Sequence, residues 1–515
     1  MYPGEHARLR PDKPAIIMAG SGEVLTYGEL ERRSNRLAHL LRANGLRRLD
    51  HYAVFMENNA RYVECCAAGE RAGLYYTCIN SYLTPDEVAY IVNNSESKIL
   101  ITSRAKRTVA LAAMRRCPNV ALCLIVDGPG DGRVQNLDEA AAEFPDTPIG
   151  DETLGTAMLY SSGTTGRPKG ILRPLPEQPP SQGLPVYSFL MNLWRFRDGM
   201  TYLSPAPLYH AAPHAGVAFT IHLGGTAVIM EHFDPEHFLR LVEQYKVTHT
   251  QLVPTMFSRM LKLPEETRRG YDLSSLEIAI HAAAPCPIQV KEQMIEWWGP
   301  IVFEYYGMTE GIGFTACDSA EWLAHKGTVG HVLFGDLHIL DEAMNPVSAG
   351  TIGTVWFRLG SPFEYFNDEA RTAESLSADG TMGTVGDVGY VDADGYLYLT
   401  DRATFMIISG GVNIYPQECE DLLITHPKVA DAAVLGVPNA DLGEEVKAVV
   451  QAMPGVAPDA ELAEELMLFC REHLAHMKCP RSIDFEAELP RLPTGKLYKR
   501  LLRDRYWGER ASRIV

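Results

Sequence analysis

A run of hydroxyl-bearing residues and glycines ends in a lysine between Tyr160 and Gly170, with the sequence YSSGTTGRPKG. No acidic residue interrupts this run. A glycine-rich loop exposes backbone N–H groups, which together with a lysine can hold the oxygens of a phosphate. The spacing departs from the phosphate loop G-x-x-x-x-G-K-[ST], because Gly170 follows Lys169. A flexible surface loop has the same composition, so the run alone favours phosphate binding only modestly.

Four further stretches carry residue types that suit nucleotide chemistry. An aromatic, a glycine, a hydroxyl and an acid share the turn YYGMTEG at 305–311. Asp387 and Arg402 flank an expected hairpin in GDVGYVDADGYLYLTDR. SGGVNIYPQECE follows at once, and Lys496 lies in LPRLPTGKLYKR. Taken one at a time, Asp387 could be a turn residue, Glu310 a surface acid and Lys496 a solvated lysine. Five such motifs in this order are poorly explained by coincidence.

These stretches, in this order and spacing, resemble the adenylate-forming superfamily of acyl-CoA synthetases, peptide-synthetase adenylation domains and firefly luciferase. The motifs run from about residue 160 to 496. HAAAPCP, EWWGP and the chain length look most like the acyl-CoA ligase branch. The resemblance implies that a carboxylate attacks the α-phosphate of ATP and releases pyrophosphate, after which a thiol displaces AMP from the acyl-adenylate.

The resemblance also implies how ATP is held. The loop should hold the β- and γ-phosphates through Ser161, Ser162, Gly163, Thr164, Thr165, Gly166 and Lys169. Tyr306 should stack on adenine, and Asp387 should accept hydrogen bonds from both ribose hydroxyls, with Arg402 nearby. Further ATP contacts are expected at Ala283, Tyr305, Gly307 and Met308.

A catalytic set is implied in the same way. Lys496 should bridge the substrate carboxylate and the α-phosphate, which Thr309 also contacts. Glu310 should hold Mg²⁺, a hard cation that suits carboxylate and phosphate oxygens. His210 should gate the acyl pocket and approach the carboxylate. Expected substrate contacts are His210, Gly216 and Gly307, and Gly410 and Gly411 should leave room for the pantetheine arm of coenzyme A.

Two departures from the superfamily pattern stand out. Alanines replace frequent glycines in His281-Ala282-Ala283-Ala284-Pro285, which should narrow the approach to adenine. Thr404 occupies the domain hinge, where relatives usually carry Asp or Lys. His210 and His214 have the i, i+4 spacing of metal ligands, but Pro213 lies between them and no H-E-x-x-H acid is present, so we do not expect zinc there.

The elements that must position these residues have the sequence pattern of an α/β fold. Capping boxes at Thr26/Glu29 and Thr84/Glu87 each predict a helix start. Short apolar runs such as KILIT, VTHTQLV, LEIAI and IVFEYY alternate with helical sequence, which indicates largely parallel sheets. After about residue 390 the sequence pattern changes to that of a small α+β domain. Paired strands are predicted there in VADAAVLGVPNADLGEEVKAVVQAM. We therefore expect a large N-terminal domain over 1–402 and a small mobile domain over 403–515.

Length and composition limit the number of domains, the possible partners and the cellular compartment. A length of 515 residues predicts two or more domains, and a formal charge of −18 argues against nucleic acid or anionic membrane as partner. Ten cysteines without a C-x-x-C pair indicate reduced thiols in a cytoplasmic protein. Residues 203–230 contain no charged side chain other than histidine, but prolines and a Gly-Gly pair predict a buried helix and a strand there, not a membrane span.

The same uncharged stretch limits the class of acid that the enzyme can use. An amino-acid-activating domain would need a carboxylate there, because a buried unpaired ammonium costs several kcal/mol. We therefore expect an apolar acid, fatty, aromatic or steroid-like, joined to coenzyme A with ATP and Mg²⁺, and a place in fatty acid metabolism. Transfer to a carrier-protein thiol is the main alternative, although no carrier domain is seen. A luciferase-like oxidative step and a homodimer are left open, whereas the presence of Lys496 and Glu310 argues against an ATP-sensing module.

Overall fold

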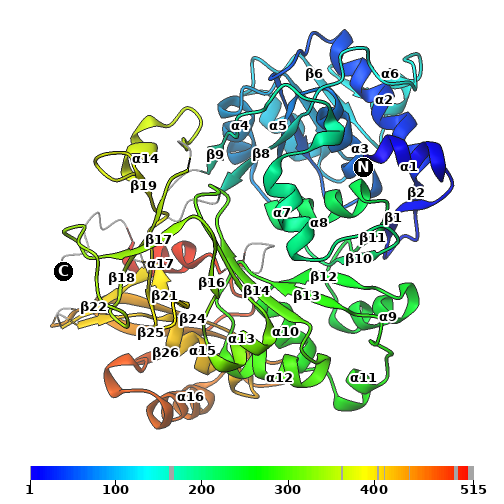
Figure 1. The fold of residues 1–515 in the computed structure, drawn as a ribbon. Helices are drawn as coiled ribbons and strands as arrows, with labels where there is room; N and C mark the ends of the chain where they lie inside the picture. Colours follow the sequence, from blue (N-terminus) through cyan, green and yellow to red (C-terminus); the bar gives the residue numbers. More distant parts are fainter. Residues whose placement is uncertain are drawn as a thin grey trace. The chain divides into compact units, whose positions relative to one another are not determined.

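The computed structural model describes residues 2–161, 168–360, 363–402, 405–410, 412–439, 441–491 and 497–508, without the side chains of residues 401 and 402. The chain forms two compact units. The first comprises Met1–Gln251, Tyr271–Ala279 and Phe363–Thr372, and the second comprises Leu252–Gly270, Ile280–Pro362 and Ala373–Val515. Figure 1 colours the chain from the blue N-terminus, in the first unit, to its red end in the second.

A seven-stranded sheet lies at the centre of the first unit, in the order β7-β6-β5-β3-β4-β8-β9. Its strands are β3 (His51–Phe55), β4 (Tyr75–Cys78), β5 (Ile99–Thr102), β6 (Leu122–Ile125), β7 (Val134–Asn136), β8 (Thr156–Ser161) and β9 (Lys169–Ile171). All neighbours are parallel except β8 and β9. The parallel sheet expected from the alternating apolar runs is therefore confirmed.

Helices cover both faces of this sheet, because successive strand residues point to opposite sides. On β5, Ile99 and Ile101 join one apolar core and Leu100 joins the other. The helices are α1 (Pro3–Leu9), α2 (Tyr27–Ala43), α3 (Ala60–Arg71), α4 (Pro85–Asn94), α5 (Arg107–Met114) and α6 (Leu137–Ala141). Both predicted capping boxes are present, with the side chain of Thr26 starting α2 and that of Thr84 starting α4.

A second run of strands in the first unit has the order β12-β10-β11-β1-β2. Its strands are β1 (Pro14–Met18), β2 (Val24–Thr26), β10 (Thr201–Ser204), β11 (Thr226–Ile229) and β12 (His249–Leu252). The accompanying helices are η1 (Pro180–Gln182), α7 (Pro185–Leu193), α8 (Ala211–His222) and α9 (Pro235–Tyr245). The buried helix expected near Pro213 is α8, which begins at Ala211. No helix in the described ranges is both long and apolar enough to cross a membrane.

The second unit contains two sets of strands before residue 403. One runs β13-β14-β15-β16, with β13 (Ile278–His281), β14 (Val302–Gly307), β15 (Phe314–Cys317) and β16 (His331–Phe334). The other is antiparallel and consists of β17 (Asp336–Leu340), β18 (Gly353–Arg358), β19 (Met382–Gly383), β20 (Asp387–Val391) and β21 (Leu397–Arg402). The helices are α10 (Pro254–Leu261), α11 (Glu265–Arg269), α12 (Ile288–Trp298) and α13 (Ser319–Ala324), while α14 (Glu369–Glu374) begins in the first unit and ends in the second.

The last hundred residues of the second unit form a sheet with helices. Its strands are β22 (Ile407–Ser409), β23 (Val412–Ile414), β24 (Val429–Asn439), β25 (Gly443–Ala452) and β26 (Ser482–Phe485). Its helices are α15 (Gln417–Thr425), α16 (Ala460–His473), η3 (His476–Lys478) and α17 (Lys499–Trp507). The long antiparallel pair β24–β25 confirms the strands predicted around a polar turn. A predicted boundary at residue 402 stays a prediction.

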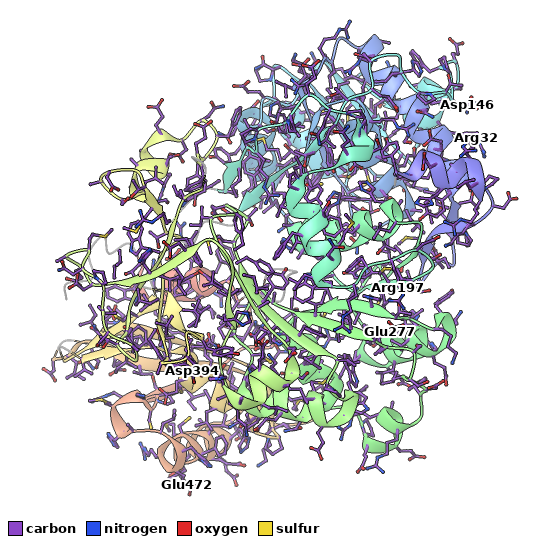
Figure 2. All side chains as sticks on the ribbon, in the orientation of Figure 1. Arg32, Asp146, Arg197, Glu277, Asp394 and Glu472 are labelled. Carbon is purple, nitrogen blue, oxygen red and sulfur yellow. The ribbon has the colours of Figure 1, made fainter. Side chains whose placement is uncertain are left out.

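The cysteines are mostly buried, and charged side chains lie over the surface (Figure 2). All ten cysteines are free, and nine are buried. Figure 2 shows charged side chains over the surface, among them Arg197 and Glu277, whose ion pair measures 2.5 Å. Because both side chains of this pair are nearly half exposed, solvent screens their interaction.

Candidate active site

The glycine-rich loop connects two antiparallel strands of the first unit. Ser161 ends β8 and is paired with Lys169, which begins β9. A Cβ atom at Gly170 would lie 2.7 Å from the Cε of Met158, so a side chain here would require Met158 to shift. The strand pair therefore fixes both ends of the loop. The expected phosphate contacts Ser162, Gly163, Thr164, Thr165 and Gly166 lie outside the described residues.

A segment far along the chain supports the lysine that ends this loop. The Nζ of Lys169 lies 4.3 Å from the centroid of the Tyr365 ring. The carbonyl of Gly170 accepts a hydrogen bond of 2.8 Å from the backbone N–H of Phe366. A cation over an aromatic face is attracted by the ring quadrupole, so Tyr365 helps to place the ammonium group. Sequence reasoning missed Tyr365, since no motif marks it.

The turn YYGMTEG is a hairpin loop in the second unit. Tyr305, Tyr306 and Gly307 end β14, which is antiparallel to β15. Met308, Thr309 and Glu310 follow in the turn, and Gly311 closes it with φ +70° and an N–H bonded to the carbonyl of Met308 at 2.9 Å. Glycine adopts this left-handed backbone without strain. The hairpin thus presents a hydroxyl and a carboxylate on one tight turn.

Two of the expected ATP contacts meet in the second unit. The hydroxyl of Tyr306 donates a hydrogen bond of 2.7 Å to Oδ2 of Asp387. Asp387 is buried and begins β20, where its register partner is Arg402 at the end of β21. The predicted hairpin around these two residues is confirmed, while the Arg402 side chain lies outside the described atoms. The contact places the ring that is expected to stack on adenine next to the carboxylate that is expected to bind ribose.

A buried ion pair, which sequence reasoning missed, joins β14 to α12. Nζ of Lys291, on α12, lies 2.5 Å from Oε2 of Glu304, and both side chains are almost fully buried. The Lys291 ammonium also lies 4.7 Å from the Trp322 ring centroid. Burial raises the pKa of Glu304, and the ammonium opposes that shift. The pair holds the strand that carries Tyr305 and Tyr306 against α12.

The alanine-rich turn adopts a backbone that glycine usually provides. Ala283 has φ +75°, in the left-handed region. Its neighbour His281 is fully buried, and burial lowers the pKa of its imidazole well below the usual range. The substitution of alanine for glycine therefore adds backbone strain as well as a methyl group. The expected contact of Ala283 with adenine stays a prediction.

His210 lies at the start of α8 in the first unit. Burial lowers the pKa of His210 to about 3, so its imidazole is neutral at physiological pH. In the described part of the chain its Nε2 makes no hydrogen bond. On the same helix, a Cβ at Gly216 would lie 2.4 Å from the hydroxyl of Tyr202, so Gly216 packs against β10. This packing explains the glycine, and a substrate contact there stays a prediction.

The expected pantetheine loop joins β22 and β23 in the second unit. Gly410 has φ +56° and donates its N–H to the carbonyl of Leu442 at 2.9 Å. The antiparallel pairing of β22 and β23 makes this a hairpin turn. Gly411, Thr404 and the expected catalytic Lys496 lie outside the described residues.

Family models cover most of the chain. Residues 4–363 match the model of the AMP-binding enzyme, and residues 418–496 match that of the AMP-binding enzyme C-terminal domain. The chain belongs to the AMP-binding enzyme family. Because relatives named as CoA ligases also match it over almost its whole length, it is an acid–thiol ligase of the adenylate-forming superfamily, with ATP and a thiol as co-substrates. The order of the two matches agrees with a large N-terminal part and a small C-terminal part.

Individual members of the family are similar over almost the whole chain. A feruloyl-CoA synthase of an Amycolatopsis species is 34% identical over 98% of this chain and 98% of its own length. The fatty acid–[acyl-carrier-protein] ligase ScoC of Streptomyces coeruleorubidus is 30% identical over 99% and 96%. The anthranilate CoA ligase AuaEII, in complex with anthranoyl-AMP, superposes with a TM-score of 0.82 at 25% identity over 98% and 96%.

Proposed function

We propose that this enzyme joins an apolar carboxylic acid, with aromatic acids foremost, to coenzyme A through an acyl-adenylate. The observation that carries the choice of acid is α8 with its flanks, because residues 203–230 hold no Asp, Glu, Lys or Arg. His210 is neutral there, since burial lowers its pKa to about 3. A substrate with an ammonium or second carboxylate would find no charged partner in this stretch. The similarity to a feruloyl-CoA synthase and to an anthranilate ligase supports an aromatic acid.

The residues take the following roles in this proposal. The β8–β9 loop and Lys169 bind the triphosphate, while the Tyr306 ring and Asp387 bind adenosine. His210 faces the carboxylate and, with its proton on Nε2, donates a hydrogen bond to it. Lys496 neutralises the charge that develops between carboxylate and α-phosphate. We also assign the cytoplasm as the setting, in line with ten free thiols.

A magnesium ion fits the donors of the hairpin turn. Thr309 and Glu310 offer a hydroxyl and a carboxylate on adjacent residues, and hard oxygen donors are those that Mg²⁺ takes. We assign Glu310 as its protein ligand. When bound, the ion would neutralise charge on the triphosphate.

The test is a panel of acids offered with ATP. Release of pyrophosphate and formation of thioester are measured with coenzyme A for a 4-hydroxycinnamic-type acid, benzoate, a medium-chain fatty acid, malonate and phenylalanine. We expect the aromatic acids to give the largest kcat/KM, the fatty acid a smaller one, and malonate and phenylalanine none above background. Preferred use of malonate or phenylalanine would contradict the proposal.

Transfer to a carrier protein is the second candidate, favoured by the similarity to ScoC. The same panel is repeated with a phosphopantetheinylated acyl-carrier protein in place of coenzyme A. Faster thioester formation on the carrier would assign this second function, and formation on coenzyme A alone would exclude it.

A further inference from the structure

Three side chains with metal-binding atoms meet in the interior of the first unit. Cys66 lies on α3, Cys78 ends β4 and His214 lies in the first turn of α8. One ligand atom of each residue lies within 4.8 Å of the other two. Both cysteines are only 3% exposed. None of the three belongs to the residues that are proposed to bind ATP, coenzyme A or the acid.

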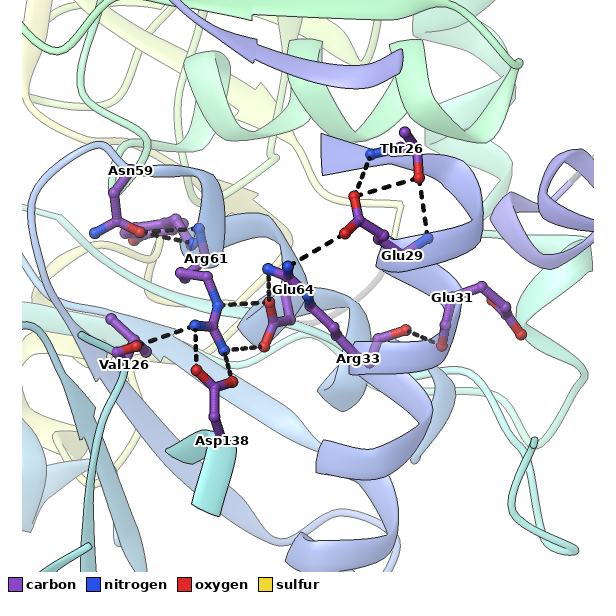
Figure 3. A network of polar contacts seen from close by, with 11 residues as sticks. Thr26, Glu29, Glu31, Arg33, Asn59, Arg61, Glu64, Val126 and Asp138 are labelled. Atoms are coloured by element: carbon purple, nitrogen blue, oxygen red, sulfur yellow. Dashed lines mark hydrogen bonds and ion pairs between the residues drawn. The ribbon is translucent and has the colours of Figure 1, made fainter. Parts of the chain in front are cut away.

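The helix that carries Cys66 is held firmly in place. Asn59 caps α3 by accepting hydrogen bonds from the N–H groups of Arg61 and Tyr62. The Arg61 guanidinium then forms bonds of 2.6–3.0 Å with Glu64 and Asp138, which ties α3 to α6 (Figure 3). A cysteine on so fixed a helix loses little further freedom when it binds an ion, and preorganised ligands bind more tightly for that reason.

The surroundings of the three side chains are polar enough to support a ligand shell. Tyr62 lies one turn before Cys66 on the same face of α3. Its hydroxyl is fully buried. The hydroxyl lies beside the thiol of Cys78.

A neighbouring strand contributes a polar contact to the histidine ring. The hydroxyl of Tyr76, on β4, lies 3.1 Å from Nε2 of His214. A hydrogen bond to one ring nitrogen fixes the tautomer and the ring plane of a ligating histidine.

We propose that Cys66, Cys78 and His214 bind one Zn²⁺ ion as a structural site. Two thiolates and an imidazole are a donor set that zinc prefers, with a fourth position for water or for the Tyr62 hydroxyl. Binding releases one proton from each thiol, so two thiolate charges balance the two charges of the ion. The buried site therefore carries no net charge, which avoids the cost of an unpaired ion in the interior.

The site would tie the first turn of α8 to α3 and β4. Because α8 begins directly after His210, the ion would steady the backbone that presents this histidine. Zinc would hold α3, β4 and α8 together, and it would not take part in the transfer of the acyl group. The inference holds for any acid that the enzyme uses.

The first test measures zinc on the full chain. Chelator-treated enzyme is titrated with Zn²⁺ against a chromophoric chelator, and with Co²⁺ as a spectroscopic probe of thiolate ligands. We expect one equivalent of tightly bound metal, a thiolate-to-cobalt absorption band and a Tm that rises with Zn²⁺. Cys66→Ser and Cys78→Ser should each weaken Zn²⁺ binding by about 100-fold or more and remove most of the band. Absence of binding, or binding undiminished in both variants, would overturn the proposal.

Cys65→Ser is the matched control. Cys65 is buried next to Cys66 but is not among the three clustered residues, so its variant should bind zinc as the wild type does. A second measurement needs no variant. Thiol alkylation of the wild-type enzyme in mild denaturant, followed by peptide mass mapping, should show Zn²⁺ protecting Cys66 and Cys78 and leaving Cys65 unprotected. Equal labelling with and without Zn²⁺ would contradict the site.

Discussion

At the scale of single residues, the hydrogen bond from Tyr306 to Asp387 gives a sharp test of nucleotide binding. Asp387→Asn keeps the shape of the side chain but removes the charge that strengthens hydrogen bonds from ribose hydroxyls. A hydrogen bond to a charged group contributes about 1.5–3 kcal/mol, so KM for ATP should rise roughly 10-fold or more. Tyr306→Phe is the control, since it keeps the ring and removes only the hydroxyl, and its effect should be smaller. An unchanged KM for ATP in Asp387→Asn would remove Asp387 from the site.

Ala283 provides a second test, of backbone strain. A left-handed conformation costs a residue with a Cβ about 1–2 kcal/mol, whereas glycine adopts it freely but loses about 0.5–1 kcal/mol of chain entropy. Ala283→Gly should therefore raise Tm slightly, measured at a fixed scan rate. A lowered Tm would mean that the alanine methyl group makes packing contacts that outweigh the strain.

Only part of this residue-scale detail could be predicted from the sequence. The roles of Tyr306 and Asp387 are implied by the resemblance and stay predictions, while the structure shows that the two side chains are hydrogen-bonded. The contact of Lys169 with Tyr365 joins segments that are far apart in the chain, and only the folded sheet brings them together. Aromatic side chains are common in cores, so the sequence gives no reason to single out Tyr365.

At the scale of elements, the buried pair of Lys291 and Glu304 is the support that a variant can remove. Lys291→Met removes the ammonium partner of Glu304 and leaves the buried imidazole of His281 3.5 Å from the carboxylate, which should destabilise the second unit by about 3–5 kcal/mol. Burial already raises the pKa of Glu304, so the unpaired carboxyl should take up a proton in the variant. A raised carboxyl pKa gives stability that is present at low pH and lost as pH rises through the folded value. The Tm of Lys291→Met should therefore fall between pH 5 and pH 8.

The double variant Lys291→Met/Glu304→Gln is the matched control for this pair. It removes both charges, so it should regain part of the Tm and lose the added pH dependence. If the single and double variants behave alike, the ion pair does not hold β14 against α12.

Local elements were more predictable than their packing. The capping boxes of α2 and α4 depend on residues three apart, and both are confirmed. The hairpin β20–β21 follows from a glycine-containing turn between apolar runs, and it is confirmed as well. The partnership of Lys291 and Glu304 depends on how α12 packs on β14, which no local pattern encodes.

At the scale of the whole molecule, neutral buried histidines should make the enzyme sensitive to acid. Burial lowers the pKa of His210 to about 3 and that of His249 to about 4, below the usual value near 6.5. Unfolding exposes both rings, which then take up protons. Their contribution to stability is therefore complete above pH 6.5 and is lost as pH falls toward 4, by up to about 1.4 kcal/mol per pH unit for each ring. The carboxylate of Glu70 raises the pKa of His222, which opposes this trend.

This acid sensitivity is measured as Tm against pH from 8 to 5. His249→Gln removes one of the titrating rings, so its Tm should fall less steeply with decreasing pH than that of the wild type. A wild-type Tm that stays constant between pH 7 and pH 5, or an identical slope in the variant, would contradict the assignment.

The chain-wide fold was predictable because motifs and alternating apolar runs extend over most of the sequence. The α/β class and the family are confirmed. The division at residue 402 and the mobility of the small domain over 403–515 stay predictions. Those two features concern motion of one part of the chain against another, and a sequence specifies the elements more directly than their alternative arrangements.

The central claim is that the acid reacts with the α-phosphate of ATP before it reaches the thiol. The most direct measurement supplies a substrate acid labelled with ¹⁸O in its carboxylate and analyses AMP and pyrophosphate by mass spectrometry. In an acyl-adenylate route a carboxylate oxygen bonds to the α-phosphorus, pyrophosphate leaves, and the thiol then displaces AMP from the carbonyl carbon. Each AMP should therefore carry one ¹⁸O from the acid, and pyrophosphate should carry none. Label in pyrophosphate or orthophosphate, or AMP without label, would contradict the account.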